Sequence, residues 1–568
     1  MAWVQVYDPL GHAWLSTLAA ALPIVLLLVT LGLMNWPAHR AALLGLGSAL
    51  IVSVGLFGMP VGIAVETTIY GAAYGLFPIG WIVVGAIFLY NLSVTSGTFA
   101  VVKQSVARLS SDRRIQALLV AFSFGAFIEG ASGFGTPVAI SAALLMGLGF
   151  TPHRAASLSL IANTAPVAFG ALATPILTLA SVTGLPAFTL GAMAGRQLPF
   201  VSVLIPAWLV VVMSGWRGLR SVWPAVLACG GSFAAVQFIW SNYVGPELVD
   251  IVGGLVSLGC VGVLCLKWRP RDHATEAVTS RPAHLPGRQV ARAWLPWIVL
   301  SVFVTLWGLT PVKRLLTTGS WLPGNGPGVS LSRWLAPQVE VPGLHKRVFR
   351  EYPVVPAAVD AARIGDAAYQ RAHAEAAVFT GNWLSATGTG ILLAALATAW
   401  LLRIPRRTVF TVARDTARQM RRSLLTISLM MALGFVTRYG GTDATLGLAF
   451  TKTGVMYPFF AAMLGWLGVA LTGSDTSSNV LFGSLQRITA EQLGLNPVLI
   501  TTANSTGGVM GKMIDAQTIV VAGAATGQSG QEGTLLRAVF WHSLALAGIM
   551  GVIVMAQAYL FPWMIPAP

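Results

Sequence analysis

Two carboxylates, Glu129 and Asp475, lie inside stretches of sequence that are otherwise apolar or built of small residues. Glu129 occurs in FIEGASGFGTP, and Asp475 occurs in LTGSDTSSNVLFG. An ionised carboxylate at the depth of a bilayer is costly unless it is paired or hydrated, and desolvation favours its protonated form. Such a group can take up and release a proton, so we predict that Glu129 and Asp475 carry protons. The structural alternative for both is an acid that caps a helix beside a glycine turn.

A lysine and several neutral polar side chains occur in the same kind of sequence. Lys512 follows TGGVMG and could either hold a substrate carboxylate or form a charge pair with Asp475 or Asp515. Hydroxyl and amide groups can bind the carboxylate and hydroxyl of a small substrate, although asparagines at helix breaks are often only caps. We predict substrate contacts from Lys512 and from Asn163, Thr164, Asn504, Ser505, Thr506, Ser132, Ser474, Thr476 and Ser477.

These residues fall in four segments that interrupt the apolar pattern: 128–138, 162–176, 472–483 and 503–518. Each segment places Gly, Pro, Ser, Thr or Asn between apolar runs. Irregular backbone at membrane depth is tolerated only where it is buried in protein or lines a cavity. Broken helices also expose backbone N–H groups, whose positive ends favour a carboxylate. The four segments therefore predict broken helices that meet around a binding site near the middle of the membrane.

The composition predicts the elements that must position these residues. Of the 568 residues, 55% are hydrophobic and only 10% are charged, and the mean hydropathy is +0.73. Uncharged blocks such as 15–34 and 377–402 are long enough to cross a bilayer, which takes roughly 20 residues per helix. We predict an all-α polytopic membrane protein with about 12 to 14 crossings. The first apolar block begins late and follows no basic region, so it is expected to be a retained helix rather than a signal peptide.

The net charge of +16 is explained by topology rather than by nucleic acid. Six basic residues lie in 267–292, and seven arginines against one acid lie in 403–422. The positive-inside rule places both stretches in the cytoplasm, and the longer, mixed loop 312–376 between them on the outside. We therefore expect the lipid bilayer, and no nucleic acid, as the large-scale partner of this chain.

An internal repeat is predicted from three pairs of matching residues, which occur in the same order and at nearly constant separation. They are Gly97 with Gly441, Glu129 with Asp475, and Asn163 with Asn504. Repeated halves are common in secondary transporters. The predicted organisation is N-terminal helices in 1–77, a first repeat in 78–215, intervening helices in 216–423 with a basic cytoplasmic loop at 268–293 and the external loop at 312–376, and a second repeat in 424–560.

Several function classes are disfavoured by what the sequence lacks. The three cysteines lie in apolar blocks at spacings that match no metal site, and the histidines lie in loops or near segment ends. A membrane-embedded enzyme would need a reactive cluster, and a passive channel would not need paired breaks with embedded acids. No GxxxxGK[ST] phosphate-binding loop is present. We predict a secondary transporter that is not an enzyme and has no metal or cofactor.

Five runs of the sequence closely resemble the bacterial L-lactate permease family. They are GAFIEGASGFGTPVAISAALLMGLGF (125–150), NTAPVAFGALATPI (163–176), GRQLPF (195–200), GWLGVALTGSDTSSNVLF (465–482) and ANSTGGVMGKMI (503–514). The resemblance spans nearly the whole chain. It implies uptake of L-lactate, D-lactate and glycolate by proton symport across the bacterial inner membrane. Its signature segments contain Glu129, Asn163, Asp475, Asn504 and Lys512.

The chain departs from the family pattern at two places. Asp515-Ala516-Gln517 stands where the family usually has Ser-Pro-Gln, and Arg438 and Asp443 bring charges to a turn that is usually neutral in relatives. Arg438 could pair with Asp443, and Asp515 lies three residues after Lys512, within reach of a pair on one helix face. These changes bear on substrate preference. A different small carboxylate, or Na⁺ in place of the proton, is the alternative on the same fold.

Overall fold

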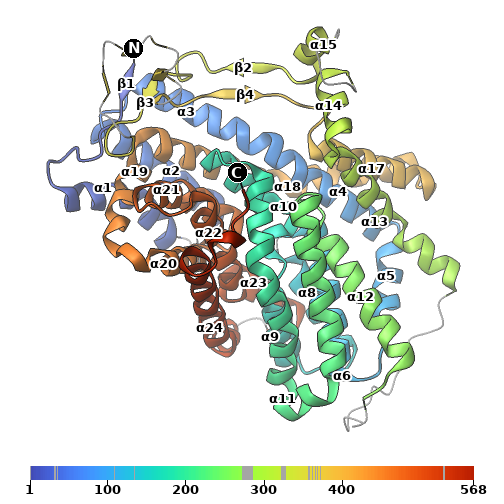
Figure 1. Cartoon of the computed structure of the whole chain (residues 1–568). Coiled ribbons are helices and arrows are strands. Elements are labelled where there is room, and N and C mark those ends of the chain that lie inside the picture. The colour runs from blue at the N-terminus through green and yellow to red at the C-terminus, as the bar shows by residue number, and fades with distance from the viewer. Residues whose placement is uncertain are drawn as a thin grey trace.

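Helices make up most of the described chain in the computed structural model shown in Figure 1. The model describes residues 2–30, 34, 36–107, 109–133, 135–270, 286–320, 328–355, 359–360, 363–364, 366, 369–370, 373–528 and 531–567. Residues 271–285 of the predicted basic loop lie outside these ranges. The predicted all-α architecture is confirmed.

Eight helical stretches in the described residues are long and apolar enough to cross a membrane, and a ninth candidate is the pair Pro152–Ala162 and Val167–Thr183, bent by 67°. The chain is therefore a multi-pass membrane protein. The eight stretches are Val61–Thr95, Arg113–Ala131, Ala187–Tyr243, Val249–Lys267, Gly287–Trp307, Arg406–Gly440, Thr442–Ala470 and Glu532–Tyr559. Shorter apolar helices are Ala13–Leu27, His39–Gly55, Pro137–Gly147 and Thr387–Leu401.

The first broken element is a helical hairpin over residues 113–149, called hairpin 1. Its first arm is α6 (Arg113–Ala117), a π-helical stretch (Leu118–Phe124) and α7 (Gly125–Ser132), and its second arm is α8 (Thr136–Gly147). Gly133 and Gly135 reverse the chain between the arms with φ of 60° and 77°, which glycine adopts without strain. A Cβ built on Gly149 would lie 3.4 Å from Nη2 of Arg113. The two ends of hairpin 1 therefore lie together, as in a segment that enters and leaves on one side.

A broken helix follows hairpin 1. It consists of α9 (Pro152–Ala162), a short 3₁₀ turn (Val167–Phe169) and α10 (Gly170–Thr183). Ala171, Leu172 and Ala173 have positive φ, so the backbone is irregular at the start of α10. Because the turn falls within the predicted segment 162–176, this break is confirmed.

The C-terminal part of the chain contains the same two kinds of element. Hairpin 2, residues 457–492, joins α20 (Tyr457–Thr472) to α21 (Asp475–Gln492) through Gly473, whose φ is 73°. A broken helix follows, in which α22 (Pro497–Gly511) and α23 (Ala516–Ala525) are separated by a 3₁₀ turn (Lys512–Ile514) and the extended Asp515. All four predicted breaks are therefore present.

The remaining helices surround these elements. α18 (Arg406–Gly440) packs closely against the stretch 61–95, because Cβ atoms built on Gly71 and Gly75 would lie 2.7 Å and 2.8 Å from the α18 backbone. The others are α1 (Ala13–Leu28), α2 (Ala38–Gly55), α3 (Val61–Tyr74), α4 (Trp81–Thr95), α5 (Thr98–Ala107), α11 (Ala187–Tyr243), α12 (Val249–Lys267), α13 (Gly287–Gly308), α14 (Thr310–Thr318), α15 (Gly328–Leu335), α17 (Thr387–Leu401), α19 (Thr442–Phe450) and α24 (Glu532–Tyr559).

Short strands tie the N-terminus to the predicted external loop. β1 (Trp3–Val4) pairs in parallel with β3 (Val348–Phe349), and β2 (Gln338–Glu340) pairs antiparallel with β4 (Val378–Thr380). We call residues 338–380 the outer loop. In Figure 1 these strands lie at the top of the molecule, whereas α6 and the lower turn of α11 lie at the bottom. The outer loop and the open ends of hairpin 1 therefore lie at opposite ends of the protein.

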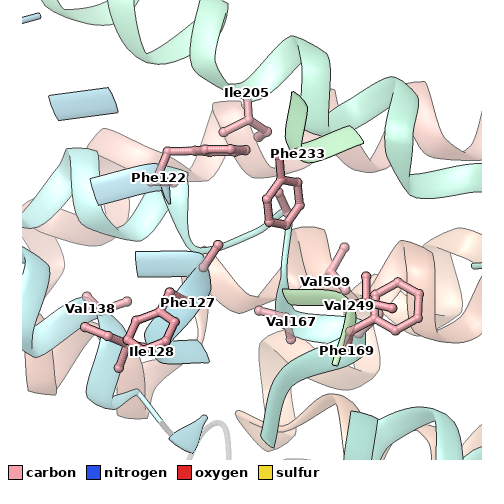
Figure 2. Packing of buried hydrophobic residues seen from close by; sticks show 14 of the residues in the cluster. Phe122, Phe127, Ile128, Val138, Val167, Phe169, Ile205, Phe233, Val249 and Val509 are labelled. Atoms are coloured by element: carbon pink, nitrogen blue, oxygen red, sulfur yellow. The ribbon is translucent and has the colours of Figure 1, made fainter. Parts of the chain in front are cut away.

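A buried apolar core holds the tip of hairpin 1 in place. Figure 2 shows Phe122 of hairpin 1 beside Phe233 of α11, and their rings meet edge-on with centroids 5.3 Å apart. Phe127 packs on a different side of the arm, where its ring meets that of Trp297 in α13 edge-on at 5.0 Å. Gly130 allows α12 to approach, since a Cβ there would lie 2.7 Å from Cβ of Asp250. Close packing of this kind resists displacement and fixes the position of the neighbouring Glu129.

Candidate functional site

A cavity of about 240 Å³ lies where the two hairpins, the two broken helices and α18 meet. Its volume equals roughly eight water molecules, so it suits a small organic acid better than a large ligand. Among the predicted site residues, Glu129, Asp475, Lys512, Ser474, Thr476 and Ser477 line it. The rest of its wall includes Gly133, Gly135, Gly170, Thr174, Ser423, Thr426, Met430, Met431, Val480 and Thr518.

Lys512 forms a buried ion pair and also lines the cavity. Its Nζ lies 3.1 Å from Oδ2 of Asp515 and donates to the carbonyl of Gly473 at 2.7 Å. The side chains of Lys512 and Asp515 are 8% and 0% exposed. Oδ1 of Asp515 accepts from the backbone N–H of Thr518 at 2.8 Å, so the acid also caps the first turn of α23. The predicted pair with Asp515 is formed, and Lys512 is also one of the residues that line the cavity.

Asp475 stands at the start of α21 but does not cap it. The N-cap is Ser474, whose hydroxyl accepts from the backbone N–H of Ser477 at 3.3 Å. Oδ2 of Asp475 accepts from the hydroxyl of Ser505 at 2.5 Å, and within the described part of the chain Oδ1 has no hydrogen-bond partner. Gly508 leaves room for this carboxyl group, because a Cβ there would lie 2.5 Å from Oδ1. Asp475 is thus a buried carboxyl with one oxygen available for a proton.

Glu129 is buried in the last turn of α7, where helix N–H groups are already used, so it is not an N-terminal cap either. Its carboxyl group fits against the irregular start of α10, since a Cβ on Gly170 would lie 2.5 Å from Oε1. Oε2 has no hydrogen-bond partner among the described residues. The glycine at 170 therefore makes the space that the carboxyl occupies at the cavity wall.

The other predicted contacts lie behind the cavity wall. Asn504, Ser505 and Thr506 are inside α22, which stays helical as far as Gly511. The Asn504 amide donates to Oδ1 of Asn479 at 2.9 Å, and the Thr506 hydroxyl donates to Oε1 of Gln197 at 2.6 Å. These bonds join α22 to hairpin 2 and to α11. We infer that the three residues support the wall that carries Asp475.

Two predicted contacts from the N-terminal broken helix, Asn163 and Thr164, stand back from the cavity. Asn163 and Thr164 are buried, and the Thr164 hydroxyl donates to the carbonyl of Ile161 at 2.6 Å. The Asn163 amide has no hydrogen-bond partner in the described part of the chain. Ser132 is the last residue of α7, and its side chain lies outside the described structure. Neither Asn163 nor Thr164 lines the cavity.

One wall of the cavity was missed by reasoning from the sequence. It is the face of α18 formed by Ser423, Thr426, Ile427, Met430 and Met431. Their spacing of three and four residues is that of one helix face, which is a signal that the sequence contains. The face leads from the cavity toward Arg421 and Arg422, which are exposed at the basic part of α18. The cavity therefore extends toward the end of the protein that the charge pattern predicts to be cytoplasmic.

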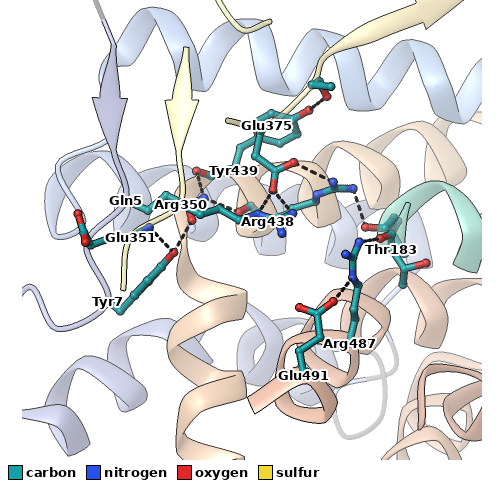
Figure 3. Close-up of polar contacts among 12 residues, drawn as sticks. Gln5, Tyr7, Thr183, Arg350, Glu351, Glu375, Arg438, Tyr439, Arg487 and Glu491 are labelled. Carbon is teal, nitrogen blue, oxygen red and sulfur yellow. Dashed lines mark hydrogen bonds and ion pairs between the residues drawn. The ribbon is translucent and has the colours of Figure 1, made fainter. Parts of the chain in front are cut away.

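The opposite end of α18 is covered by the outer loop, as Figure 3 shows. Nη2 of Arg438 lies 2.8 Å from Oε2 of Glu375, and Nη1 donates to the carbonyl of Val182 in α10 at 2.8 Å. Arg438 thus pairs with an acid of the outer loop rather than with Asp443. Burial by itself would raise the pKa of Glu375, but Arg350 and Arg438 hold it at about 2. The carboxyl group is therefore ionised throughout the physiological range.

The described residues contain no group of three or more His, Cys, Asp or Glu side chains that could hold a metal ion. The groups that the cavity offers to a ligand are instead one ammonium, two carboxyls, several hydroxyls and the N-terminal end of α21. An ammonium beside a helix N-terminus binds carboxylates, and the two carboxyls can bind protons.

Comparison with known proteins gives the family. A sequence model described as L-lactate permease matches residues 16–561. The chain belongs to the L-lactate permease family. It is 44% identical to the glycolate permease GlcA of Escherichia coli K12 over the whole of both chains. It is 44% identical to the L-lactate permease of the same strain, over 99% of this chain and 100% of the relative. The L-lactate permease of Bacillus subtilis 168 is 43% identical, with both chains fully covered.

Among solved structures, that of Neisseria gonorrhoeae MtrF, reported for a class of antimetabolite efflux pumps, aligns with a TM-score of 0.50. The alignment covers 94% of this chain and 97% of MtrF at 12% identity. This likeness concerns the fold alone. The family assignment rests on the sequence relatives, and the predicted resemblance to L-lactate permeases is confirmed.

Proposed function

We propose that this protein is a secondary transporter that carries L-lactate, D-lactate and glycolate across the bacterial inner membrane together with protons. The observation that carries the proposal is the cavity, in which Lys512, Glu129 and Asp475 converge from three separate helix breaks. The relatives are named for L-lactate and glycolate, which share a carboxylate beside a hydroxyl group. The chain transports its substrate and does not transform it.

The substrate carboxylate is bound by the Lys512 ammonium and by the N-terminal end of α21. These two groups lie close together, because Lys512 donates to the carbonyl of Gly473, which directly precedes the cap residue Ser474. The hydroxyl groups of Ser474, Thr476 and Ser477 line the same part of the cavity and are the partners for the substrate hydroxyl. Asn504 acts on this site indirectly, through Asn479 and Ser478 of hairpin 2.

Proton coupling is assigned to Glu129 and Asp475. Each is buried, lines the cavity and carries an oxygen without a hydrogen-bond partner among the described residues. A proton on either group removes a charge that is costly to move through the membrane interior. The loaded carrier therefore reorients with these groups protonated, and loss of the proton to the cytoplasm accompanies substrate release.

The opposite orientation of the two hairpins supports alternating access as the transport mechanism. Arg114 of hairpin 1 packs beside Gly218 in the lower turn of α11, at the basic end of the molecule. Gln492 at the end of hairpin 2 donates to the carbonyl of Pro353 in the outer loop at 2.9 Å. Such an arrangement is typical of inverted repeats, in which one half exposes the site to one side and the other half to the opposite side. It supports repeats near 78–215 and 424–560.

Uptake of labelled L-lactate and glycolate into proteoliposomes tests the proposal. With an inward proton gradient both acids should accumulate above the external concentration, be recovered unchanged, and leak out when a protonophore is added. Accumulation that follows a sodium gradient and survives the protonophore would select the Na⁺-coupled alternative. If correctly inserted protein accumulates neither acid under either gradient, the proposed function is wrong.

A further inference from the structure

A buried ionic cluster closes the outer end of the protein above the cavity. It consists of Arg350 and Glu375 of the outer loop and Arg438 of α18 (Figure 3). The Glu375 side chain is only 4% exposed, and each of its carboxylate oxygens bonds a different arginine. Nε of Arg350 donates to Oε1 at 2.6 Å, and Nη2 of Arg438 donates to Oε2 at 2.8 Å. The cluster therefore holds two guanidinium groups around one carboxylate.

The two halves of this cluster belong to different parts of the protein, the outer loop and α18. Glu375 and Arg350 are fixed to each other by the outer-loop backbone, since Glu375 N–H donates to Val348 and Arg350 N–H donates to His373, both at 2.8 Å. Arg438 belongs to α18, the helix whose inner half lines the cavity. A movement of the outer loop away from α18 would take Glu375 with Arg350 and would leave Arg438 without its carboxylate.

Only a thin apolar layer separates Arg438 from the cavity. Arg438 lies two helical turns, or roughly 10 Å, beyond the cavity residue Met431. Val182, Phe435 and Val480 fill the space between them in one buried cluster. Both Met431 and Val480 belong to this cluster and to the cavity wall. A ligand that enters from the outer side therefore meets Arg438 first and the apolar layer second.

We propose that Arg438 is an entrance site for the substrate carboxylate. In the absence of substrate the carboxylate of Glu375 occupies this site, and a monocarboxylate substrate displaces it. The proposal rests on the proposed function, because it takes the substrate to be a small monocarboxylate. A buried guanidinium without a partner is strongly unfavourable. A substrate carboxylate offers the same two oxygens that Glu375 offers, in a geometry that suits the arginine fork. The substrate carboxylate thus compensates the buried charge of Arg438 and favours opening on the outer side.

Protonation of Glu375 does not break its ion pair with Arg438 at physiological pH. Its pKa is held at about 2 by Arg350 and Arg438 against the opposing effect of burial. At any pH that a cell meets, Glu375 stays ionised and keeps its place on Arg438. Under this proposal another carboxylate displaces Glu375, so that opening depends on the substrate concentration outside.

A cysteine placed in the apolar layer, where it borders the cavity, reports outer opening. Cys229, Cys260 and Cys265 are replaced by alanine, and Val480→Cys is introduced at the cavity wall. Lactate uptake by this background is measured first, so failure of the proposed function is seen separately. A membrane-impermeant thiol reagent is then added outside right-side-out vesicles, with L-lactate, with the uncharged lactamide, or with neither. In the background protein L-lactate should speed labelling severalfold, and lactamide should have no effect.

Substitutions at Glu375 and Arg438 distinguish two interpretations. In the first, Arg438 binds the substrate at the entrance, and in the second, the ion pair only holds the outer loop closed. Glu375→Gln should raise the basal labelling rate about tenfold, as expected for loss of one charge-assisted contact, and should shift the lactate response to lower concentration. Arg438→Gln should also raise the basal rate but abolish the response to lactate, whereas Arg438→Lys should retain a weaker response. Glu491→Gln is the matched control, because Glu491 pairs with Arg487 on the same side of the molecule at 2.7 Å without touching Glu375.

A lactate response that persists unchanged in Arg438→Gln would overturn the proposal, since opening would then be driven from the inner cavity alone. The proposal also fails if Glu375→Gln labels no faster than Glu491→Gln. If Arg438→Gln does not insert into the membrane, the weakened response expected of Arg438→Lys decides the question. A response to lactamide equal to that of lactate would show that the carboxylate is not what is recognised.

Discussion

The buried pair of Lys512 and Asp515 allows the structural and substrate-binding roles of one lysine to be separated. Removing one partner of a buried ion pair typically costs 3–5 kcal/mol, because the other charge is left uncompensated, whereas removing both is often close to neutral. Asp515 keeps its bonds to Thr518 when Lys512 is lost, so we expect the lower end, about 3 kcal/mol, for Lys512→Gln. Asp515→Asn should cost a similar amount, and the double variant should regain most of the loss.

Two assays on the four proteins test this double-mutant cycle. The free energy of unfolding, followed by tryptophan fluorescence in detergent, reports the pair, and L-lactate uptake reports substrate binding. The free energy of unfolding should be lower in the two single variants than in the wild type and the double variant. Uptake should depend on Lys512 alone and be lost in both variants that lack it. Additive destabilisation would refute the pair. Normal uptake with an unchanged KM in the double variant would refute the role of Lys512 in binding the substrate.

Three further predictions follow from the same geometry. Glu129→Gln should abolish gradient-driven accumulation and spare lactate exchange between the two sides; normal accumulation would remove Glu129 from the coupling step. Gly170→Ala should impair uptake, because the new Cβ would lie 2.5 Å from Oε1 of Glu129, whereas Gly147→Ala, in open space, should be neutral; equal uptake by the two variants would contradict this account of the wall. The pKa of Glu375 falls from its ordinary 4.5 to about 2 on folding, so its stabilising effect is complete above about pH 4.5 and is lost as the pH falls toward 2. Unfolding measured between pH 2 and 6 should show a loss of about 3 kcal/mol that is absent in Glu375→Gln, and an identical pH profile in both proteins would argue against the ion pair.

The helix breaks could be predicted because their causes are local in sequence. Gly133, Gly135 and Gly473 adopt positive φ, and Lys512 begins a turn directly after a glycine. At membrane depth the polar side chains of the four breaks must face other protein groups or a cavity. Glu129, Asp475 and Lys512 do line one cavity. Local chemistry was therefore enough for the charged part of the site.

The remaining features depend on packing that the sequence does not state. Asn504 and Thr506 face hairpin 2 and α11 because α22 stays helical until Gly511, beyond the polar run that suggested a break. The cavity face of α18 is visible as a periodic pattern, but nothing in the pattern tells which neighbour it meets. Arg438 pairs with Glu375, 63 residues away along the chain, rather than with the nearby Asp443. Contacts of that sequence separation require the folded structure.

In the proposed transport cycle, lactate and protons move together through a site that contains Glu129. The most direct test records both in liposomes that hold the protein and a trapped pH indicator, with no gradient imposed. Adding external L-lactate should acidify the lumen in step with lactate uptake, faster than in protein-free liposomes, and this acidification should vanish in Glu129→Gln while exchange continues. Lactate uptake by the wild type without any proton movement above the protein-free rate would contradict the account.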